Sequence, residues 1–545
     1  MSVSFNSAPI LLTDEQMRQY VVDGYVMLEP SVPDELHETI RRKLADVLEA
    51  GINPGNNVLP RVPEMRHILN SPEVRGALIS ALGEGYIEHP HRYCHHLAPV
   101  TDPDPEPEIK LAANCHQDSY TPLGRPRQHY SRFARIMYYP QDTPIELGPT
   151  HAIPGTQFHK RLTDEDRAQA IPMEGKAGTV SLTHFDVGHA AGVNLLNQPR
   201  DMIKFIYVRA SEPTAPSWDC QNLQWQNPAA IETPHNLELV WSHMWDWLCG
   251  KRDRYESFRS NGVQSTTNHL YQYIAALEED QDLADRLRAI YDLAGLGSDA
   301  AEAIPALISM LDKDHQAARV AAIYTLGVIG EPAVAPLMER LKAAGRREDA
   351  QPVPESWNEG AISMEDAAHA LTAIGAPAVP ALTEALESSS EWVRINASFA
   401  LGELDSHAAS AVSKLAAHLS DDSHRVVRTA TDALGSIHQD APTFIPHISR
   451  LLTEGRLDWH EEERRGWTIQ DQVRTNAAMV FTRLGKDAAG AEEVLFHAMD
   501  DPCGHVGAFA MDALRRIDSP AARQVVMAYL EAQRWDESIT ADRQF

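Results

Sequence analysis

Basic residues are scarce in this chain of 545 residues. Lysine and arginine together number 48, against 77 aspartates and glutamates, so that the formal net charge is −29 and the isoelectric point is near 5.2. Binding to a polyanion needs a basic face. The composition therefore argues against a nucleic-acid partner, and an acidic surface of this kind is typical of plain solubility.

Cysteines and long apolar runs are also scarce. The five cysteines are scattered and form no C-x-x-C pair, which argues against a disulfide framework or a zinc ribbon and fits a reducing compartment. No apolar stretch approaches the ~20 residues that a bilayer span needs, and residues 1–10 carry no basic region. We therefore expect a soluble, cytoplasmic protein with no membrane partner.

The length exceeds what one hydrophobic core usually holds, so two or more domains are expected. Pattern and composition suggest three parts. We expect a β-rich domain over residues 1–215, a tryptophan-rich helical connection over 216–280 and an all-α solenoid over 281–545.

Two potential metal ligands, His116 and Asp118, are separated by one residue. The preceding segment 108–115 is expected to be a strand, and residues i and i+2 of a strand point to the same face. An imidazole and a carboxylate would then stand side by side, as two ligands of one metal do. On its own this pattern is weak, because two polar residues at a strand end are common.

A second histidine downstream strengthens the metal hypothesis. His189 follows a turn after a strand expected over 178–185, and Arg200 comes eleven residues later, just before a strand expected over 202–208. Two histidines and one carboxylate leave coordination positions open and suit non-haem Fe(II) that activates O2. A fixed guanidinium near the third ligand matches a carboxylate co-substrate through paired hydrogen bonds.

From roughly residue 10 to residue 215 the chain resembles the phytanoyl-CoA dioxygenase family of Fe(II)- and 2-oxoglutarate-dependent oxygenases. Each matching piece is short, but the pieces occur in the order of the family. They are residues 12–16 and 23–25, 116–118, 146–149 and 153–156, 178–180, and the positions His189, Asn194 and Arg200. The resemblance implies an antiparallel jelly roll, or double-stranded β-helix, with flanking helices and with the metal between its sheets.

The same resemblance implies roles for particular residues. His116, Asp118 and His189 would be the iron ligands, and Arg200 would bind the distal carboxylate of 2-oxoglutarate. Gln117 resembles a position that contacts the co-substrate, and Asn194 a position near the site. Where the family often has tryptophan, in the strand expected over 132–139, this chain has methionine and tyrosines, and Tyr138 is the candidate for that contact. Ala191 stands where the family often has serine or glycine, so one co-substrate hydrogen bond is absent or replaced.

The implied activity is oxidation of a small organic substrate, with conversion of 2-oxoglutarate and O2 to succinate and CO2. Family members that halogenate have a small residue in place of the carboxylate ligand. This chain keeps Asp118, which favours hydroxylation. Two alternatives stay open: an interaction or scaffold protein with an oxygenase-like domain, and a zinc or manganese cupin hydrolase or isomerase, which would give Arg200 no role.

Several other features allow a structural and a functional interpretation. Four histidines near the start of the β-rich region fit no single tetrahedral site and are expected to be surface or core residues, as are His151 and His184; the four are His89, His91, His95 and His96. Half of the ten tryptophans lie between residues 218 and 247. We expect them to pack between the domains, and a substrate-stacking wall is the alternative.

The C-terminal half repeats. One apolar slot recurs at steps of 33, 45, 30, 33, 47 and 33 residues, at Leu293, Leu326, Leu371, Leu401, Leu434, Phe481 and Leu514. This spacing, with alanine-rich contacts, predicts a helical solenoid. Segments 329–337 and 374–382 resemble the short HEAT repeats of phycobilisome lyase-type proteins. Arginines at corresponding places, Arg394, Arg428 and Arg474, are expected to form a ladder inside the solenoid and not a binding patch.

The two long steps contain insertions at about 343–360 and 454–471, which carry tryptophans and charges. No Gly/Ser linker separates the tryptophan-rich segment from the first repeat, so the domains are expected to pack directly. We expect one or both insertions to approach the mouth of the metal site. The alternative is that they face solvent and that the solenoid binds a protein partner.

Overall fold

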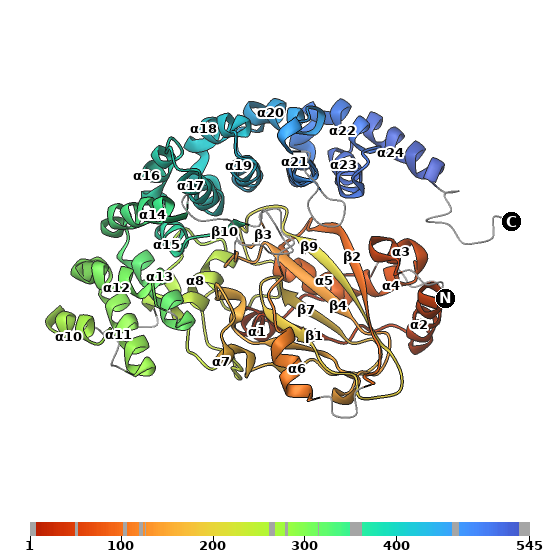
Figure 1. Cartoon of the computed structure of the whole chain (residues 1–545), viewed down its shortest axis with the longest axis horizontal. Coiled ribbons are helices and arrows are strands. Elements are labelled where there is room, and N and C mark those ends of the chain that lie inside the picture. Colours follow the sequence, from red (N-terminus) through yellow and green to blue (C-terminus); the bar gives the residue numbers. More distant parts are fainter. Residues whose placement is uncertain are drawn as a thin grey trace.

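An arc of helices surrounds a β-rich domain in the computed structural model, with that domain on the concave side of the arc (Figure 1). The structure describes residues 7–49, 53–101, 106–118, 124–125, 127–260, 267–277, 282–313, 315–348, 362–459 and 468–533. The N-terminal helices are α1 (Asp14–Asp23), α2 (Asp34–Glu49), α3 (Val58–Arg61), α4 (Met65–Leu69), α5 (Pro72–Leu82), α6 (Pro107–Asn114) and α7 (Asp164–Arg167).

The strands form three sheets. They are β1 (Tyr25–Leu28), β2 (Ile87–Leu97), β3 (Gly124–Arg125), β4 (Phe133–Tyr138), β5 (Thr150–Ile153), β6 (Ile171–Pro172), β7 (Val180–His184), β8 (Gly188–Ala191), β9 (Arg200–Val208) and β10 (Ile362–Ser363). A five-stranded antiparallel sheet has the order β1-β7-β4-β9-β2, and a three-stranded antiparallel sheet has the order β6-β5-β8. The third sheet pairs β3 with β10 in parallel.

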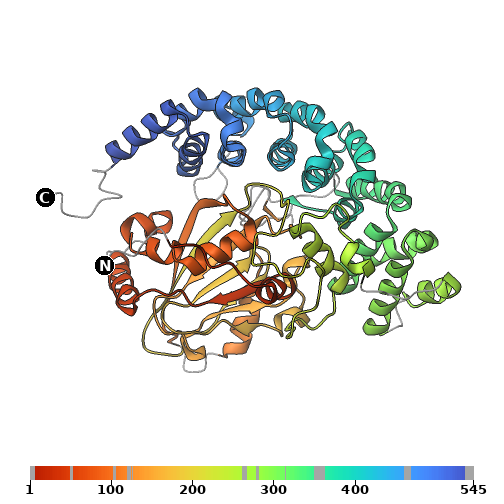
Figure 2. The same ribbon diagram turned by 180° about the vertical axis from the view of Figure 1, so that it is seen from behind.

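The two faces of the large sheet have different surroundings. One face packs against N-terminal helices, which lie in front of the sheet in the reverse view (Figure 2). Residues at alternate positions of β9, among them Ile203 and Phe205, belong to this apolar core, as the period of two in the sequence predicts. The opposite face carries the buried cations Arg135 of β4 and Lys204 of β9, which approach Asp118. The metal-ligand candidates therefore lie on the side of the large sheet away from the helices.

Most expected elements are present, but segment 108–115 is helical and the strand prediction there was wrong. Helix α6 has Pro107 in its first turn, where the missing N–H costs nothing, and Glu108 near the positive end of the helix dipole. Good helix formers, Leu111 and two alanines, follow. The helix has no buried residue, so propensity and not burial decides its structure. Helix α1 starts with a capping box formed by Thr13 and Gln16.

The tryptophan-rich connection is packed as core. It contains α8 (Glu238–Leu248), α9 (Glu256–Ser260) and α10 (Leu270–Ala275). The rings of Trp218, Trp225 and Trp245 lie edge to face, with centroids 4.8 and 5.7 Å apart, and all three are buried. Helix α8 contacts both α1 and the solenoid, so these tryptophans pack between the domains, as expected.

The solenoid alternates inner and outer helices. The inner helices are α11 (Leu283–Leu296), α13 (Gln316–Ile329), α15 (Asp366–Ile374), α17 (Glu391–Glu403), α19 (His424–Ile437), α21 (Ile469–Leu484) and α23 (Gly504–Ile517). The outer helices are α12 (Ile304–Met310), α14 (Val334–Glu348), α16 (Val379–Ala385), α18 (Val412–Ala417), α20 (Ala441–Thr453), α22 (Glu492–Ala498) and α24 (Pro520–Gln533). Each of the seven predicted slot residues falls on an inner helix and is fully buried.

Side-chain contacts between repeats support the predicted ladder. Arg394 donates to both carboxylate oxygens of Asp421 at 2.9 and 3.0 Å, and Arg474 donates to Asp501 of the following repeat at 2.5 Å. These arginines therefore cross-link neighbouring repeats.

Among the described residues, no single helix is both long and apolar enough to cross a bilayer. Helices α13 and α14 reach that length and apolar composition only together, and the pair is bent by 118° at the break between them.

The inner helices pack directly on the β-rich domain. Arg132 donates to Glu403 at the end of α17 at 2.6 Å, and the His129 ring stacks on His369 of α15 with centroids 4.3 Å apart. Near the end of the arc, Arg516 of α23 donates to the carbonyl of Gly85 at 2.8 Å. Direct packing of the two domains is thus confirmed for the described residues.

The two insertions lie partly outside the described residues, which omit 349–361 and 460–467. The described chain that follows the first insertion contacts the β-rich domain. Directly after the first insertion, β10 pairs in parallel with β3, which begins six residues after Asp118. A strand of the solenoid therefore pairs with the chain that closely follows the metal-ligand candidates His116 and Asp118.

Candidate metal centre

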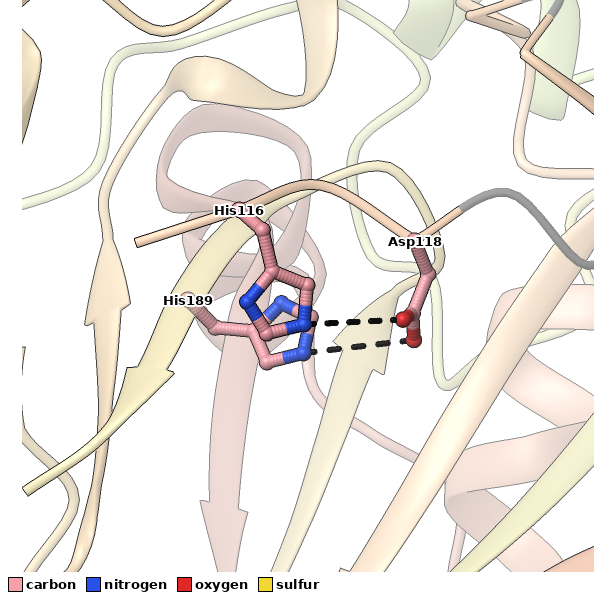
Figure 3. Close-up of side chains that lie close together, drawn as sticks. All are labelled: His116, Asp118 and His189. Atoms are coloured by element: carbon pink, nitrogen blue, oxygen red, sulfur yellow. Dashed lines mark ion pairs between the residues drawn. The ribbon is translucent and has the colours of Figure 1, made fainter. Parts of the chain in front are cut away.

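His116, Asp118 and His189 come together, as the sequence predicts (Figure 3). The Nε2 atom of His116 lies 3.8 Å from Oδ1 of Asp118, and Nε2 of His189 lies 3.9 Å from Oδ2. All the potential ligand atoms lie within 4.8 Å of one another. Asp118 and His189 are buried, whereas His116 is exposed, with 55% of its side chain accessible.

Backbone pairing places the two imidazoles side by side. Although the segment before His116 is helical, the chain becomes extended there and forms a bridge to β8. The N–H of each of His116 and His189 donates to the carbonyl of the other at 2.9 Å, and the ring centroids are 4.4 Å apart. Asp118 follows two residues later in the same extended stretch. The i, i+2 argument therefore holds for a short bridge, without the long strand that was expected.

The imidazoles are oriented for metal binding. Nδ1 of His116 lies 2.8 Å from the carbonyl of Asn114, and Nδ1 of His189 lies 3.2 Å from the carbonyl of Val187. A carbonyl only accepts, so each Nδ1 carries the proton, and each Nε2 presents its lone pair to the space beside Asp118. A hydrogen bond of this kind on the remote nitrogen is usual for metal-bound histidine. The donor set and its orientation therefore fit a divalent metal.

Two buried cations surround the carboxylate, and sequence reasoning missed both. Arg135 of β4 forms an ion pair with Asp118 and has Nη1 3.1 Å from Nε2 of His189, while Nζ of Lys204 of β9 lies 3.7 Å from Oδ2. Burial alone would raise the pKa of Asp118, but Lys204 and Arg135 hold it well below its usual range. Burial and then Arg135 hold the pKa of His189 well below its usual value, so that its imidazole is neutral.

Arg200 is placed on the same face of β9 as Lys204, four residues away. Its side chain is buried, with 1% accessible, and its Nε donates to the carbonyl of Gly148 at 3.0 Å. Burial lowers the pKa of Arg200 from its ordinary value without removing its charge in the neutral range. The guanidinium is thus fixed by the backbone on the interior side of the sheet.

The Gln117 side chain points away from the ligand candidates. Its Nε2 lies 3.0 Å from each of three backbone carbonyls, those of Thr156, His159 and Asp186, and its two N–H groups are shared among them. Neighbours in an extended segment face oppositely, which turns Gln117 away when His116 and Asp118 face the centre. Gln117 instead anchors the ligand segment to the turn that precedes His189.

Arg127 also anchors the ligand segment to the turn before His189. Its Nη1 donates to the carbonyl of Asp118 at 2.9 Å and to Oδ1 of Asp186 at 3.0 Å. It therefore fixes the backbone of one ligand against the turn before another.

Tyr138 and Asn194 also lie outside the ligand cluster. The Tyr138 hydroxyl is 2.8 Å from Nδ1 of His37 in α2, on the helix-covered face of β4 and opposite Arg135. Asn194 donates to the carbonyls of Leu97 at 3.1 Å and Gln198 at 2.8 Å and shapes the loop before Arg200. Strand alternation thus directs Tyr138 to the face of β4 opposite Arg135, away from the position that the expected co-substrate contact would need.

Two of the four clustered histidines face the centre. On β2, His95 lies opposite Met202 of β9, and burial, followed by the charge of Lys204, lowers the pKa of both His91 and His95 to about 3. The His91 ring stacks on that of His505 of α23, with centroids 6.2 Å apart. Both side chains are partly buried, and His91 connects the solenoid to the surroundings of Asp118.

The comparisons with known proteins agree with this geometry. Residues 20–202 match the model of the phytanoyl-CoA dioxygenase (PhyH) family. The PhyH match contains all three ligand candidates and Arg200. Residues 272–351 and 365–456 match the HEAT repeat model, which confirms the predicted repeats. A search of curated proteins found no match.

Solved structures similar to this chain include non-haem oxygenases. The carbocyclase SnoK of nogalamycin biosynthesis, described as alpha-ketoglutarate dependent, is 18% identical, with 38% of this chain and 88% of that one covered and a TM-score of 0.29. EctD from S. alaskensis, with 2-oxoglutarate and 5-hydroxyectoine, is 16% identical, with 42% and 89% covered and a TM-score of 0.30. Iron-bound HygX from Streptomyces hygroscopicus is 14% identical, with 36% and 87% covered and a TM-score of 0.29.

Proposed function

We propose that this protein is an Fe(II)- and 2-oxoglutarate-dependent dioxygenase that hydroxylates a small organic substrate. The observation that carries the proposal is the convergence of two Nε2 lone pairs and one carboxylate, with both Nδ1 atoms fixed by carbonyls. His116, Asp118 and His189 would hold the iron, which supplies O2 activation coupled to decarboxylation of 2-oxoglutarate to succinate. The PhyH match over residues 20–202 supports the same class.

The protein's own contribution is to position and to shield. Arg200, buried and fixed by the carbonyl of Gly148, would pair with the distal carboxylate of 2-oxoglutarate. Arg135 and Lys204 neutralise Asp118 and orient its oxygens. The two antiparallel sheets on either side of the ligands support a double-stranded β-helix as the fold of this domain. The retained carboxylate of Asp118 favours hydroxylation over halogenation.

Protein binding through the HEAT solenoid is the second candidate function, and the HEAT match favours it. The inner face of the arc is engaged by the β-rich domain, through Arg132–Glu403 at 2.6 Å, and by the tryptophan-rich connection, through Arg254–Asp405 at 2.6 Å. A partner would therefore use the outer helices. This arrangement supports a solenoid that holds the oxygenase domain, whether or not it also binds another protein.

The test is succinate formation from 2-oxoglutarate without added substrate, in the presence of Fe(II), O2 and a reductant. The wild-type protein should form succinate, and His189→Ala should not, because one of three ligands is lost. His438→Ala, in the solenoid and far from this centre in the chain, is the matched control and should behave as the wild type. Succinate formation by His189→Ala at the wild-type rate would contradict the proposal.

A further inference from the structure

A second group of potential metal ligands lies at the junction of the three parts of the chain. It consists of Glu165 of α7, His235 of the connection and His315, which directly precedes α13. Nε2 of His235 lies 3.9 Å from Oε1 of Glu165, and Nε2 of His315 lies 4.0 Å from Oε2. The two rings meet edge to face, with centroids 5.3 Å apart.

The separations between these atoms match those of the first trio. They are longer than hydrogen bonds, so the three donors converge on a common point without closing on one another. Ligands about 2 Å from a tetrahedral metal lie about 3.3 Å apart. Small side-chain rotations of His235, His315 and Glu165 would therefore complete the coordination, just as at His116, Asp118 and His189 with their 3.8 and 3.9 Å separations.

The segment that carries His235 is held in place by contacts on both sides. The N–H of Thr233 donates to Oδ1 of Asp23 at 3.1 Å, and the hydroxyl of Tyr291 in α11 donates to the carbonyl of Asn236 at 2.5 Å. Residues 232–236 are thus fixed to the first helix of the chain and to the first helix of the solenoid. The imidazole is presented by an ordered backbone.

The other two donors are held together as well. The N–H of Lys160 donates to Oε1 of Gln316 at 3.1 Å, which ties the start of α13 to the loop before α7. A capping box of Thr163 and Asp166 encloses Glu165 and fixes its helical turn. The convergence of all three donors therefore rests on contacts that need no metal, so that the site is preformed.

The chemistry of the donors suits one class of ion. Burial is the main cause that lowers the pKa of both His235 and His315, so both imidazoles are neutral near pH 7 and their lone pairs are available. Two imidazoles and one carboxylate are ligands of borderline divalent transition metals. Glu165 is 61% accessible, which leaves the fourth position open to water.

We propose that Glu165, His235 and His315 form a second metal site, which takes a divalent transition ion of the Zn²⁺ class. The ion joins the β-rich domain, the connection and the solenoid at one point. An ion that binds only the assembled junction stabilises it by mass action. The site is independent of the oxygenase chemistry, because its ligands come from residues outside the first trio.

The experiment counts bound Zn²⁺ by equilibrium dialysis on the full-length, tag-free His116→Ala variant, in which the first trio lacks one ligand while Asp118 stays in place as the counter-ion of Arg135 and Lys204. We expect about one equivalent to remain bound. Adding His235→Ala and His315→Ala should remove it, and adding Glu165→Gln, an exposed and fold-neutral change, should weaken binding about tenfold or more. Co²⁺ in place of Zn²⁺ should show ligand-field absorption that disappears in the same variants.

The matched control is His438→Ala in the same His116→Ala background. His438 also lies beside a carboxylate, with Nε2 3.0 Å from Oδ2 of Asp487, but among the described residues this pair belongs to no group of three potential ligands. This change should leave the bound equivalent in place. Absence of any bound Zn²⁺ in His116→Ala, or the same stoichiometry with and without His235, His315 and Glu165, would overturn the proposal and leave the oxygenase assignment untouched.

Discussion

Asp118 has two tasks in this structure, as a potential metal ligand and as the counter-ion of Arg135 and Lys204. His116, in contrast, is half exposed and donates only locally, to Asn114. Loss of either side chain removes one ligand, but only the loss of Asp118 leaves buried charges without their counter-ion. The two substitutions should therefore separate metal binding from folding.

We predict that His116→Ala loses iron-dependent activity with an unchanged thermal midpoint, whereas Asp118→Ala also lowers the free energy of unfolding by about 3–5 kcal/mol, as expected for breaking a buried ion pair. Differential scanning calorimetry of the metal-free proteins measures the difference. Replacing Arg135 by Met in the Asp118→Ala protein should recover part of the lost stability. Equal midpoints for His116→Ala and Asp118→Ala would contradict the structural role of the carboxylate.

Arg200→Ala should raise the apparent KM for 2-oxoglutarate roughly ten- to hundredfold, from the ~1.5–3 kcal/mol of a hydrogen bond to a charged group. Arg200→Lys should rescue this in part, because an ammonium lacks the planar fork. Initial rates of succinate formation over a range of 2-oxoglutarate concentrations provide the measurement. An unchanged KM in Arg200→Ala would move the carboxylate site elsewhere.

At the scale of single residues, the sequence was sufficient to predict the candidate metal ligands but not the residues that surround them. Spacing and resemblance indicated the trio, because the ligands themselves are chemically distinctive. Arg135 and Lys204 could have been found as lone cations in the middle of apolar strands, a pattern that signals a buried partner. The side chain of Gln117 could not be placed, since its direction depends on carbonyls that come from distant parts of the chain.

Among the elements, α6 and β10 show where local pattern and tertiary structure diverge. Segment 108–115 was expected to be a strand, but Pro107 in the first turn and the alanines that follow Leu111 favour a helix, and Ile109 is exposed. The pairing of β10 with β3 joins residues more than two hundred positions apart, which no local pattern reports. The repeats were predictable because each one depends mainly on its neighbours.

The β10–β3 pairing leads to a prediction about the first insertion. Replacing residues 349–361 by a short Gly-Ser turn should leave substrate-free succinate formation intact, because the ligands and Arg200 are unchanged. Hydroxylation of a true substrate should fall or lose coupling, because β10 directly follows the insertion and pairs beside the ligand segment. The ratio of hydroxylated product to succinate is the measurement, and a ratio equal to that of the wild type would show that this insertion has no part in the site.

For the molecule as a whole, the two domains share one interior. The same buried apolar cluster extends from Leu12 near the N-terminus to Ala522 in the last repeat. The hydroxyl oxygen of Tyr255 lies 3.3 and 3.1 Å from the carbonyls of Tyr324 and Ala373, which share its one proton, in a space that a side chain on Gly327 would fill. The solenoid is therefore a structural part of the same unit as the β-rich domain, as the absence of a flexible linker predicted.

The buried Arg132–Glu403 ion pair should contribute to the stability of this assembly. Glu403→Ala leaves Arg132 buried with Glu212 as its remaining described partner, and we expect a cost of about 3 kcal/mol. Thermal unfolding measures it. Glu454→Ala, which breaks the exposed pair with Arg450, is the matched control and should have no measurable effect. Equal effects of the two changes would mean that the interface is not coupled to folding.

The most direct test of the central claim is anaerobic titration of the metal-free protein with Fe(II) in the presence of 2-oxoglutarate, followed by visible absorption. A 2-oxo acid chelated to Fe(II) gives a charge-transfer band that neither component gives alone. The wild-type protein should develop this band, saturating at about one iron per chain, and His116→Ala, which keeps its fold, should not. A wild-type protein without the band, or a His116→Ala protein with the full band, would contradict the assignment of His116, Asp118 and His189 as the iron site.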